Sequence, residues 1–273
     1  MRLLCIGDIV GRAGREVVQA LVPKLRKEQA LDLVVINAEN AAAGFGLTPA
    51  IAQDLFAAGA DVLTLGNHAW DQREMLNYIS NEPRIVRALN FRKNTPGQGA
   101  SVITTKKGKK VLVAQVMLRL FMNASECPFA ALDSLLTHYK LGGAALDAVV
   151  IDMHGEATSE KQAMGYFLDG RASVVFGTHT HVPTADARIL PQGTAYQSDL
   201  GMAGDYQSVI GFDYKIPLAR LSKDLPTGKL TPALGAGTLS GLYVNIDDDT
   251  GLALGLAPLR LGGVLQEVNR PPW

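Results

Sequence analysis

The sequence predicts an α/β fold built around a largely parallel sheet. Short apolar runs typical of buried strands, beginning with Leu3 to Ile6, alternate with segments whose apolar residues recur at helical spacing, beginning with Gly11 to Gln29. This alternation repeats through the first 80 residues. Strands that alternate with helices form parallel sheets with right-handed crossovers. Pro23 could kink or split the first of these helices.

The next elements follow in the same rhythm. Leu33 to Ile36 and Val62 to Leu65 are predicted to be the second and third strands. Pro49 to Ala58 is predicted to be a helix, because Thr48 is a suitable N-cap and proline is favoured at the first helical position. A further helix is expected from Asp71 to Ser80.

The rest of the chain is expected to contain more β-structure. Two hairpins are predicted, one around a Lys-Gly turn and one around Asp-Asp-Asp-Thr-Gly. Residues 213–237, rich in Pro, Gly and Lys, show no clear periodicity and could form a flap or excursion from a single domain spanning residues 1–273. The predicted elements are strands Ala100 to Thr104, Lys110 to Gln115, Ala148 to Asp152, Ser173 to Gly177, Leu242 to Ile246 and Leu252 to Leu259, and helices Phe129 to Leu141 and Ser159 to Leu168.

Composition excludes several classes of protein. With 26 basic and 26 acidic residues the chain lacks the basic excess that would indicate a nucleic-acid partner, and the dense cluster Lys106 to Lys110 is interpreted as a solvated hairpin turn. Cys5 and Cys127 are too few for a disulfide framework or a cysteine metal cluster. The N-terminal apolar stretch is too short for a signal peptide, and no apolar run approaches the roughly 18 residues that span a bilayer, so we expect a cytoplasmic protein without a membrane partner.

Polar side chains gather where five predicted strands end. In open α/β sheets ligands bind outside the carboxyl ends of the strands, so these side chains could converge on one site. His138, inside a predicted helix, is the one histidine assigned no role there. The residues at the strand ends are Asp8, Glu39, Asn40, Asn67, His68, His154, His179 and His181.

These residue types favour a metal site. A mixed set of oxygen and imidazole donors without cysteine suits Mn or Fe, with Zn or Mg as alternatives. Two ions about 3.5–4 Å apart clamp the attacking and leaving oxygens of a phosphoryl transfer. A carboxylate would bridge them, and either Glu39 or Asp8 could serve.

Structural explanations exist for several of these residues. Asp8 could cap the helix that follows it, and Asn40 and Asn67 could be turn residues. Glu156 could either hydrogen-bond an imidazole from outside the ligand set or be an ordinary acid at a helix start. Asp71 is interpreted as a residue at the start of a helix.

The motifs resemble those of the calcineurin-like metallophosphoesterase superfamily. Gly66-Asn67-His68 and Gly-Thr-His179-Thr-His181 match its later motifs, but Asp8-Ile9-Val10 stands where the superfamily has Asp-x-His, and Asn-Ala-Glu39-Asn40 where it has Gly-Asp. In these departures the chain resembles the YmdB-like phosphodiesterases. Longer segments within residues 1–212 also resemble this family. The similar segments are GDIVGRAGR at 7–15, NAENAAAGFGLT at 37–48, LGNHAWD at 65–71, DMHGEATSEK at 152–161, GTHTHVPTAD at 177–186 and YQSDLGMAGDYQSVIG at 196–211.

The resemblance implies a fold and a set of roles. The implied fold is a four-layer α/β metallophosphoesterase sandwich of two mixed β-sheets flanked by helices. Glu39 would bridge the two metal ions, Asn40 would replace the absent histidine, and His68 would face the substrate instead of an ion. One ion would be held by Asp8, Glu39, Asn40 and His181, and the other by Glu39, Asn67, His154 and His179.

The resemblance also implies an activity, which is hydrolysis of 2',3'-cyclic or 3',5'-cyclic AMP, and a homo-oligomer, a dimer or tetramer. The expected mechanism is attack by a hydroxide that bridges the ions, with His68 as general acid toward the leaving oxygen. Two alternatives stay open: a phosphomonoesterase or nuclease that uses the same metals, and a non-catalytic regulator that senses nucleotides or RNA.

Overall fold

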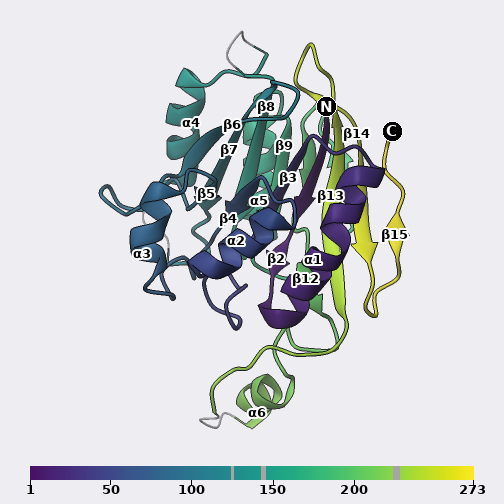
Figure 1. The fold of residues 1–273 in the computed structure, drawn as a ribbon. Coiled ribbons are helices and arrows are strands. Elements are labelled where there is room, and N and C mark those ends of the chain that lie inside the picture. Colours follow the sequence, from purple (N-terminus) through teal and green to yellow (C-terminus); the bar gives the residue numbers. More distant parts are fainter. Residues whose placement is uncertain (124–125, 143–145, 224–227) are drawn as a thin grey trace.

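Two β-sheets pack face to face and carry helices on their outer faces (Figure 1). The computed structural model describes residues 1–123, 126–142, 146–223 and 228–273. The first sheet has the strand order β15-β14-β13-β1-β3-β4-β5, and the second has the order β10-β11-β9-β8-β7-β6. Both sheets are mixed, which confirms the predicted fold class.

The first sheet has a parallel half and an antiparallel half. Strands β1, β3, β4 and β5 are parallel neighbours, as the alternating pattern predicted. Strand β13 pairs antiparallel with β1 on one side and with β14 on the other, and the short strands β2 and β12 extend the sheet beside β13. The strands are β1 (Arg2–Ile6), β2 (Asp8–Ile9), β3 (Leu33–Asn37), β4 (Val62–Thr64), β5 (Ile85–Val86), β12 (Met202–Asp205), β13 (Gly237–Ile246), β14 (Ala253–Leu261) and β15 (Val268–Asn269).

The second sheet begins with the predicted hairpin. Strands β6 and β7 pair antiparallel, and β7, β8 and β9 then run parallel. Strand β11 is parallel to β9 and antiparallel to β10. The strands are β6 (Ala100–Thr104), β7 (Lys110–Met117), β8 (Ala148–His154), β9 (Val174–Thr178), β10 (Arg188–Ile189) and β11 (Ala195–Gln197).

Three apolar layers hold the sandwich together. Successive side chains of a strand point to opposite faces, so Leu3 and Cys5 of β1 pack between the sheets while Leu4 and Ile6 pack under the outer helices. Each of these four side chains is fully buried. Both faces of the central strands are therefore covered, which explains why their sequences are continuous apolar runs.

The helices cover the outer faces of the two sheets. Helices α1 and α2 lie on the first sheet, and the core of the second sheet includes residues of α4 and α5. Helix α1 runs unbroken through the exposed Pro23, and Thr48 caps α2 by accepting a hydrogen bond from the Ile51 N–H at 3.3 Å. The helices are α1 (Gly11–Glu28), α2 (Pro49–Ala57), α3 (Met75–Tyr78), a 3₁₀ turn η1 (Ile79–Asn81), α4 (Pro128–His138), α5 (Thr158–Leu168) and α6 (Lys215–Lys223).

The helix predicted from Asp71 to Ser80 is wrong at its start. The structure forms turns up to Glu74, and α3 begins only at Met75. The Asp71 carboxylate lies 2.8 Å from His68 Nδ1, and the Gln72 amide donates to the Phe45 carbonyl at 2.8 Å. The first contact is local and the second is tertiary, and together they bind the segment to the site in place of a helical turn.

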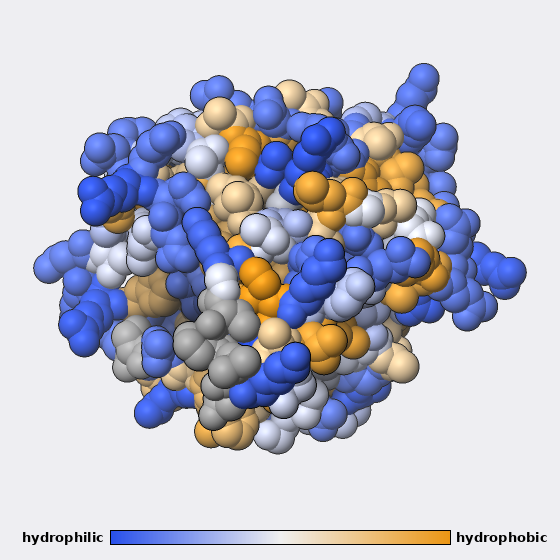
Figure 2. Space-filling view, turned by 90° about the horizontal axis from the view of Figure 1, so that it is seen from below, coloured by the Kyte–Doolittle hydropathy of each residue, from blue (hydrophilic) through white to orange (hydrophobic). Residues whose placement is uncertain are grey.

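The segment that contains α6 projects beyond the lower end of the two sheets (Figure 1). Leu218 and Leu221 of α6 are 56% and 85% exposed, and Pro217 is the one buried residue of this helix. Seen from this end, apolar side chains gather among hydrophilic ones (Figure 2). A short helix, α6, therefore lies within residues 213–237, where the sequence showed no clear periodicity.

The prediction of a hairpin turn at the basic cluster is also confirmed. Lys107 and Lys109 of the basic cluster lie in a hairpin turn, where they form ion pairs with Asp32 and Asp147. Cys5 and Cys127 are both free. Across the part of the chain that the structure describes, none of the helices is both long enough and apolar enough to cross a membrane.

Candidate metal centre

The predicted strand ends meet at one edge of the sandwich. Asp8 lies in β2, and the segments after β3 and β4 bring four further side chains from the first sheet. The second sheet contributes His154, the last residue of β8, and two histidines that follow β9. The eight predicted residues, now placed in one region, are Asp8, Glu39, Asn40, Asn67, His68, His154, His179 and His181.

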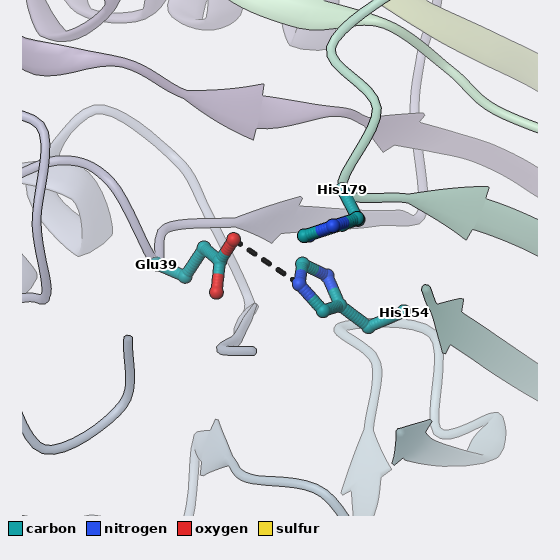
Figure 3. Close-up of side chains that lie close together, drawn as sticks. All are labelled: Glu39, His154 and His179. Atoms are coloured by element: carbon teal, nitrogen blue, oxygen red, sulfur yellow. Dashed lines mark ion pairs between the residues drawn. The ribbon is translucent and has the colours of Figure 1, made fainter. Parts of the chain in front are cut away.

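Three of these side chains form a first donor group. Glu39, His154 and His179 each offer a ligand atom, and the three atoms lie within 4.8 Å of one another. The His154 Nε2 atom is 3.1 Å from Glu39 Oε1, and the two imidazoles face each other edge to face (Figure 3). Asn67 belongs to the same cluster, since its Oδ1 lies 3.0 Å from His154 Nε2.

A second donor group shares the Glu39 carboxylate. Ligand atoms of Asp8, Glu39 and His181 also lie within 4.8 Å of one another. His181 Nε2 is 3.9 Å from Asp8 Oδ1, while its Nδ1 lies 2.8 Å from the Ile210 carbonyl oxygen, which orients the ring. Asn40 is buried near this group, and its side-chain amide donates to the Gly44 carbonyl at 2.9 Å.

Unpaired oxygens show that these residues fit metal ions. Asp8 Oδ1 and Asn40 Oδ1 are buried and have no hydrogen-bond partner within the described residues. Buried polar atoms are nearly always paired, so two orphaned acceptors beside a carboxylate and imidazoles require an explanation. A cation supplies it, because both atoms are oxygen donors of the kind that hard or borderline metals bind.

The electrostatics differ between the two groups. Burial alone would raise the pKa of Glu39, but the nearby charge and hydrogen bond of His154 lower it to about 2. Burial opposes charge on His154 as well, yet Glu39, Asp8 and Asp152 raise its pKa to about 9. Burial raises the pKa of Asp8 well above its ordinary value, and burial together with the His154 charge lowers the pKa of His179 to about 3.

A hydrogen-bond chain fixes the orientation of the His154 ring. Thr178 Oγ1 donates to Asp152 Oδ1 at 2.7 Å, so it accepts from His154 Nδ1, which lies 2.8 Å away. Nδ1 therefore carries a proton and Nε2 faces the site. Without a cation Nε2 must also be protonated to donate to Glu39 and Asn67, and this agrees with the raised pKa of His154.

The backbone around the ligands is strained or tightly packed. His179 and His181 have positive φ angles of 100° and 64°, which residues with a Cβ rarely adopt. Gly66 precedes Asn67 because any side chain there would collide with the Glu39 carboxylate and the His154 ring. Non-glycine residues with positive φ cluster at functional sites, where the surrounding structure holds them.

His68 lies beside both groups but belongs to neither. Its backbone N–H donates to Glu39 Oε2 at 3.2 Å, and its Nδ1 is 2.8 Å from Asp71 Oδ2. The ring is partly exposed and packs against the edge of Phe45, whose other neighbour is the stacked ring of Phe212. Asp71 therefore orients His68, and its interpretation as a helix-start residue is wrong.

Other structural alternatives can also be decided. Asp8 does not cap α1: Val10 occupies the N-cap position, and Asp8 Oδ2 accepts the His179 N–H at 3.1 Å. Glu156 reaches the site margin, with Oε2 3.4 Å from His179 Nε2. His138 lies on the surface of α4, as expected.

The sequence did not reveal the buried residues that support the ligands. Asp152 accepts hydrogen bonds from Asn37, Thr64 and Gln115, which join the two sheets beneath the site. Asp152 and Asn37 do end or follow strands, and this signal could have found them. Lys161, from the middle of α5, and Asp199 had no such signal and come to the site only through the tertiary fold. The supporting set comprises Asn37, Thr64, Gln115, Asp152, Lys161, Thr178 and Asp199.

Two mixed sheets with this donor arrangement at their strand ends define a phosphatase-type α/β sandwich. The chain belongs to the YmdB-like protein family, whose sequence profile matches residues 4–259. It is 44% identical over 250 residues to the 2',3'-cyclic-nucleotide 2'-phosphodiesterase of Bacillus subtilis, a match that covers 92% of this chain and 93% of that protein. The predicted class, an enzyme that hydrolyses phosphoric esters, is thereby confirmed.

Solved structures agree with this family. A hypothetical protein from Thermus thermophilus superposes with a TM-score of 0.88 at 40% identity, covering 96% of this chain and 100% of that one. A novel phosphatase from Mycoplasma pneumoniae superposes with a TM-score of 0.86 at 32% identity, covering 96% and 93%. Each match covers 96% of this chain.

Proposed function

We propose that the chain is a dinuclear-metal phosphodiesterase that hydrolyses cyclic nucleotides, with 2',3'-cyclic nucleotides as its preferred substrates. The observation that carries this proposal is that Glu39 belongs to both donor groups. A carboxylate shared by two sets of ligands would hold two ions close together, and two ions about 3.5–4 Å apart are what two-metal phosphoryl transfer uses.

The donor sets assign residues to each ion. Asp8, Glu39, Asn40 and His181 would hold one, and Glu39, Asn67, His154 and His179 the other. When bound, the ions would lower the pKa of a water molecule and neutralise charge on the phosphoryl oxygens. Because the donors are oxygens and imidazoles without cysteine, Mn or Fe is the metal that we propose.

His68 is proposed as the general acid. Asp71 engages its Nδ1, so Nε2 is the nitrogen available to donate a proton. The hydrogen bond from the His68 backbone to Glu39 places this ring next to the shared carboxylate without making it a ligand. A ribose alkoxide is a poor leaving group, and protonation by His68 as the P–O bond breaks would stabilise it.

The preference for 2',3'-cyclic substrates comes from the relative in Bacillus subtilis, whose name states that activity. Hydrolysis of such a diester adds water across one P–O bond and opens the ring, leaving a phosphomonoester on the neighbouring ribose oxygen. His68 would then protonate the ribose oxygen that is released.

A substrate panel tests this proposal. Metal-free protein is loaded with Mn²⁺ and assayed against 2',3'-cyclic AMP, 3',5'-cyclic AMP, 3'-AMP and a short RNA. We expect the highest kcat/KM for 2',3'-cyclic AMP. Faster turnover of 3'-AMP or RNA would replace the proposal by a phosphomonoesterase or nuclease, and no metal-dependent turnover of any substrate would favour a non-catalytic regulator.

The single-domain organisation, homo-oligomeric assembly and cytoplasmic location stay predictions. The exposed leucines of α6 are one surface that a second copy could cover. Light scattering of the purified chain measures the assembly directly.

A further inference from the structure

Lys161 is a fully buried lysine beneath the candidate metal centre. It lies on α5, and neither donor group includes it. Lysine is among the residues least often fully buried, and when buried it is paired. Its position therefore requires a reason that general core packing does not give.

The ion pair of Lys161 fixes the backbone on both sides of His179. Lys161 Nζ donates to the Thr178 carbonyl at 2.9 Å and to Asp199 Oδ2 at 2.7 Å. The same Asp199 oxygen accepts the Thr180 N–H at 3.0 Å. The two peptide groups that flank His179 are thus held by one buried cation and one buried anion.

This arrangement acts where the backbone is strained. His179 has a φ of 100° and His181 a φ of 64°. A β-carbon makes such angles unfavourable, so the segment would relax unless other contacts held it. The hydrogen bonds from Lys161 and to Asp199 are charge-assisted and buried, which makes them stronger than ordinary backbone hydrogen bonds.

The same pair is connected to Asp8. Asp199 Oδ1 accepts the Gly201 N–H at 2.8 Å, and the Gly201 carbonyl accepts the Asp8 N–H at 3.1 Å. Asp8 Oδ2 in turn accepts the His179 N–H at 3.1 Å. The pair therefore connects a ligand of the second donor group with a ligand of the first.

We infer that Lys161 and Asp199 are positioning residues that hold His179 and His181 in the conformation that receives the metal ions. This inference rests on the proposed function, because it concerns the same site. The opposing explanation is that the pair only stabilises the fold and that the site residues keep their positions without it.

The first test is Lys161→Met, which keeps most of the side-chain volume and removes the cation. Mn²⁺ is titrated into metal-free protein by isothermal calorimetry, and folding is followed by circular dichroism and thermal unfolding. We expect at least a tenfold loss of Mn²⁺ affinity, within the range of about 10–100-fold that loss of supporting residues around a metal usually causes. At saturating Mn²⁺ the KM for substrate should stay near the wild-type value.

Thr194→Val is the matched control for stability. Thr194 is fully buried and donates to the Ala172 carbonyl at 2.6 Å, at the end of the sheet away from the donors. The Thr194→Val substitution should lower the melting temperature and leave Mn²⁺ affinity unchanged. If Thr194→Val lost affinity in proportion to its lost stability, as Lys161→Met did, the positioning role would be overturned.

Asp199→Asn provides a second test that changes few atoms. Asp199 accepts hydrogen bonds at both oxygens, so an amide must direct its NH₂ group either at the Gly201 N–H or at Lys161 and the Thr180 N–H. We expect this variant to weaken Mn²⁺ binding by about tenfold, even if Lys161→Met does not fold.

The outcomes separate the two proposals. Wild-type Mn²⁺ affinity in a folded Lys161→Met or Asp199→Asn variant would overturn the positioning role and leave the proposed function intact. A wild-type protein that binds no Mn²⁺ would overturn both. Weaker binding in both variants with an unaffected Thr194→Val would establish the positioning role.

Discussion

The two donor groups share Glu39 but differ in how their charges are balanced. In the first group His154 Nε2 lies 3.1 Å from Glu39, so a cation and an anion are buried side by side. In the second group His181 Nε2 lies 3.9 Å from Asp8 Oδ1, and His154 Nδ1 of the first group lies 4.0 Å from the same oxygen, which has no hydrogen-bond partner within the described residues. One group is internally neutralised, and the other contains an acid without a close counterion.

This difference indicates how the site depends on metal. A buried carboxylate without a counterion is costly unless it binds a proton or a cation. The first group should therefore keep its arrangement without an ion, whereas the second should gain most of its stability from one. We therefore expect the largest effect from a substitution of the shared carboxylate. Smaller effects are expected from a residue beside both groups and from residues within one group.

The largest effect is expected from Glu39→Gln, which removes the carboxylate that both groups share. Both ions should bind much more weakly, because each group loses the carboxylate that they share and only Asp8 is left as an anionic donor. Elemental analysis after dialysis measures the metal content. Glu156→Gln is the control with the same chemical change at the site margin, and it should retain both ions. Full occupancy in Glu39→Gln would rule out the bridging role.

The second-largest effect is expected from His68→Asn, because His68 lies beside both groups. We expect kcat to fall by about 10²–10⁴-fold while metal content stays unchanged, because the variant removes only the proton donor. Steady-state kinetics at saturating Mn²⁺ give the kcat, and His138→Asn on the surface of α4 is the control. A variant that loses metal would show instead that His68 supports an ion.

Asp8→Asn should affect the second group more than the first, because an asparagine oxygen can still accept the His179 N–H. We expect one of the two ions to bind at least tenfold more weakly, since one anionic donor is lost, while the other keeps its affinity. Calorimetric titration with Mn²⁺ resolves the two events. Equal weakening of both would contradict independent donor groups.

Asp8→Asn should also change how metal-free stability depends on pH. Burial raises the pKa of Asp8, so the folded protein keeps a proton that the unfolded chain releases above about pH 4. The wild-type free energy of unfolding should therefore fall as the pH rises above about 4, by an amount that the variant does not lose. Thermal unfolding across this range tests the sign, and parallel curves would refute it.

The smallest expected effect is the release of one proton from the first group when Mn²⁺ binds. The pKa of about 9 for His154 means that its imidazole is charged near pH 7.5 in the metal-free protein, and an ion must displace one proton. Mn²⁺ affinity should thus rise with pH up to about 9. The binding enthalpy should differ between Tris and phosphate buffers, whereas identical enthalpies would show that no proton is released.

The sequence predicted those parts of the fold that depend on local pattern. Continuous apolar runs identified β1, β3 and β8, because both faces of these strands are buried. The start of α3 was misplaced because Asp71 bonds to the nearby His68 and Gln72 donates to the distant Phe45 carbonyl, and these contacts override helix propensity. Apolar periodicity could not reveal α6, because its leucines are exposed and do not form a buried face against the core.

The strand-end residues of the candidate site were predicted, but the buried residues that support them were not. Its eight proposed residues follow or end strands, and the topology of parallel strands brings such positions together. Lys161 and Asp199 lie in the similar segments 152–161 and 196–211, but they were not predicted because neither directly follows a predicted strand. Their importance depends on which peptide groups they contact, and this becomes visible only in three dimensions.

The central claim is that two ions are held on either side of Glu39, and anomalous diffraction from crystals grown with Mn²⁺ tests it most directly. We predict two anomalous peaks, one among Glu39, His154 and His179 and the other among Asp8, Glu39 and His181. A single peak, or peaks that do not contact Glu39, would contradict the claim.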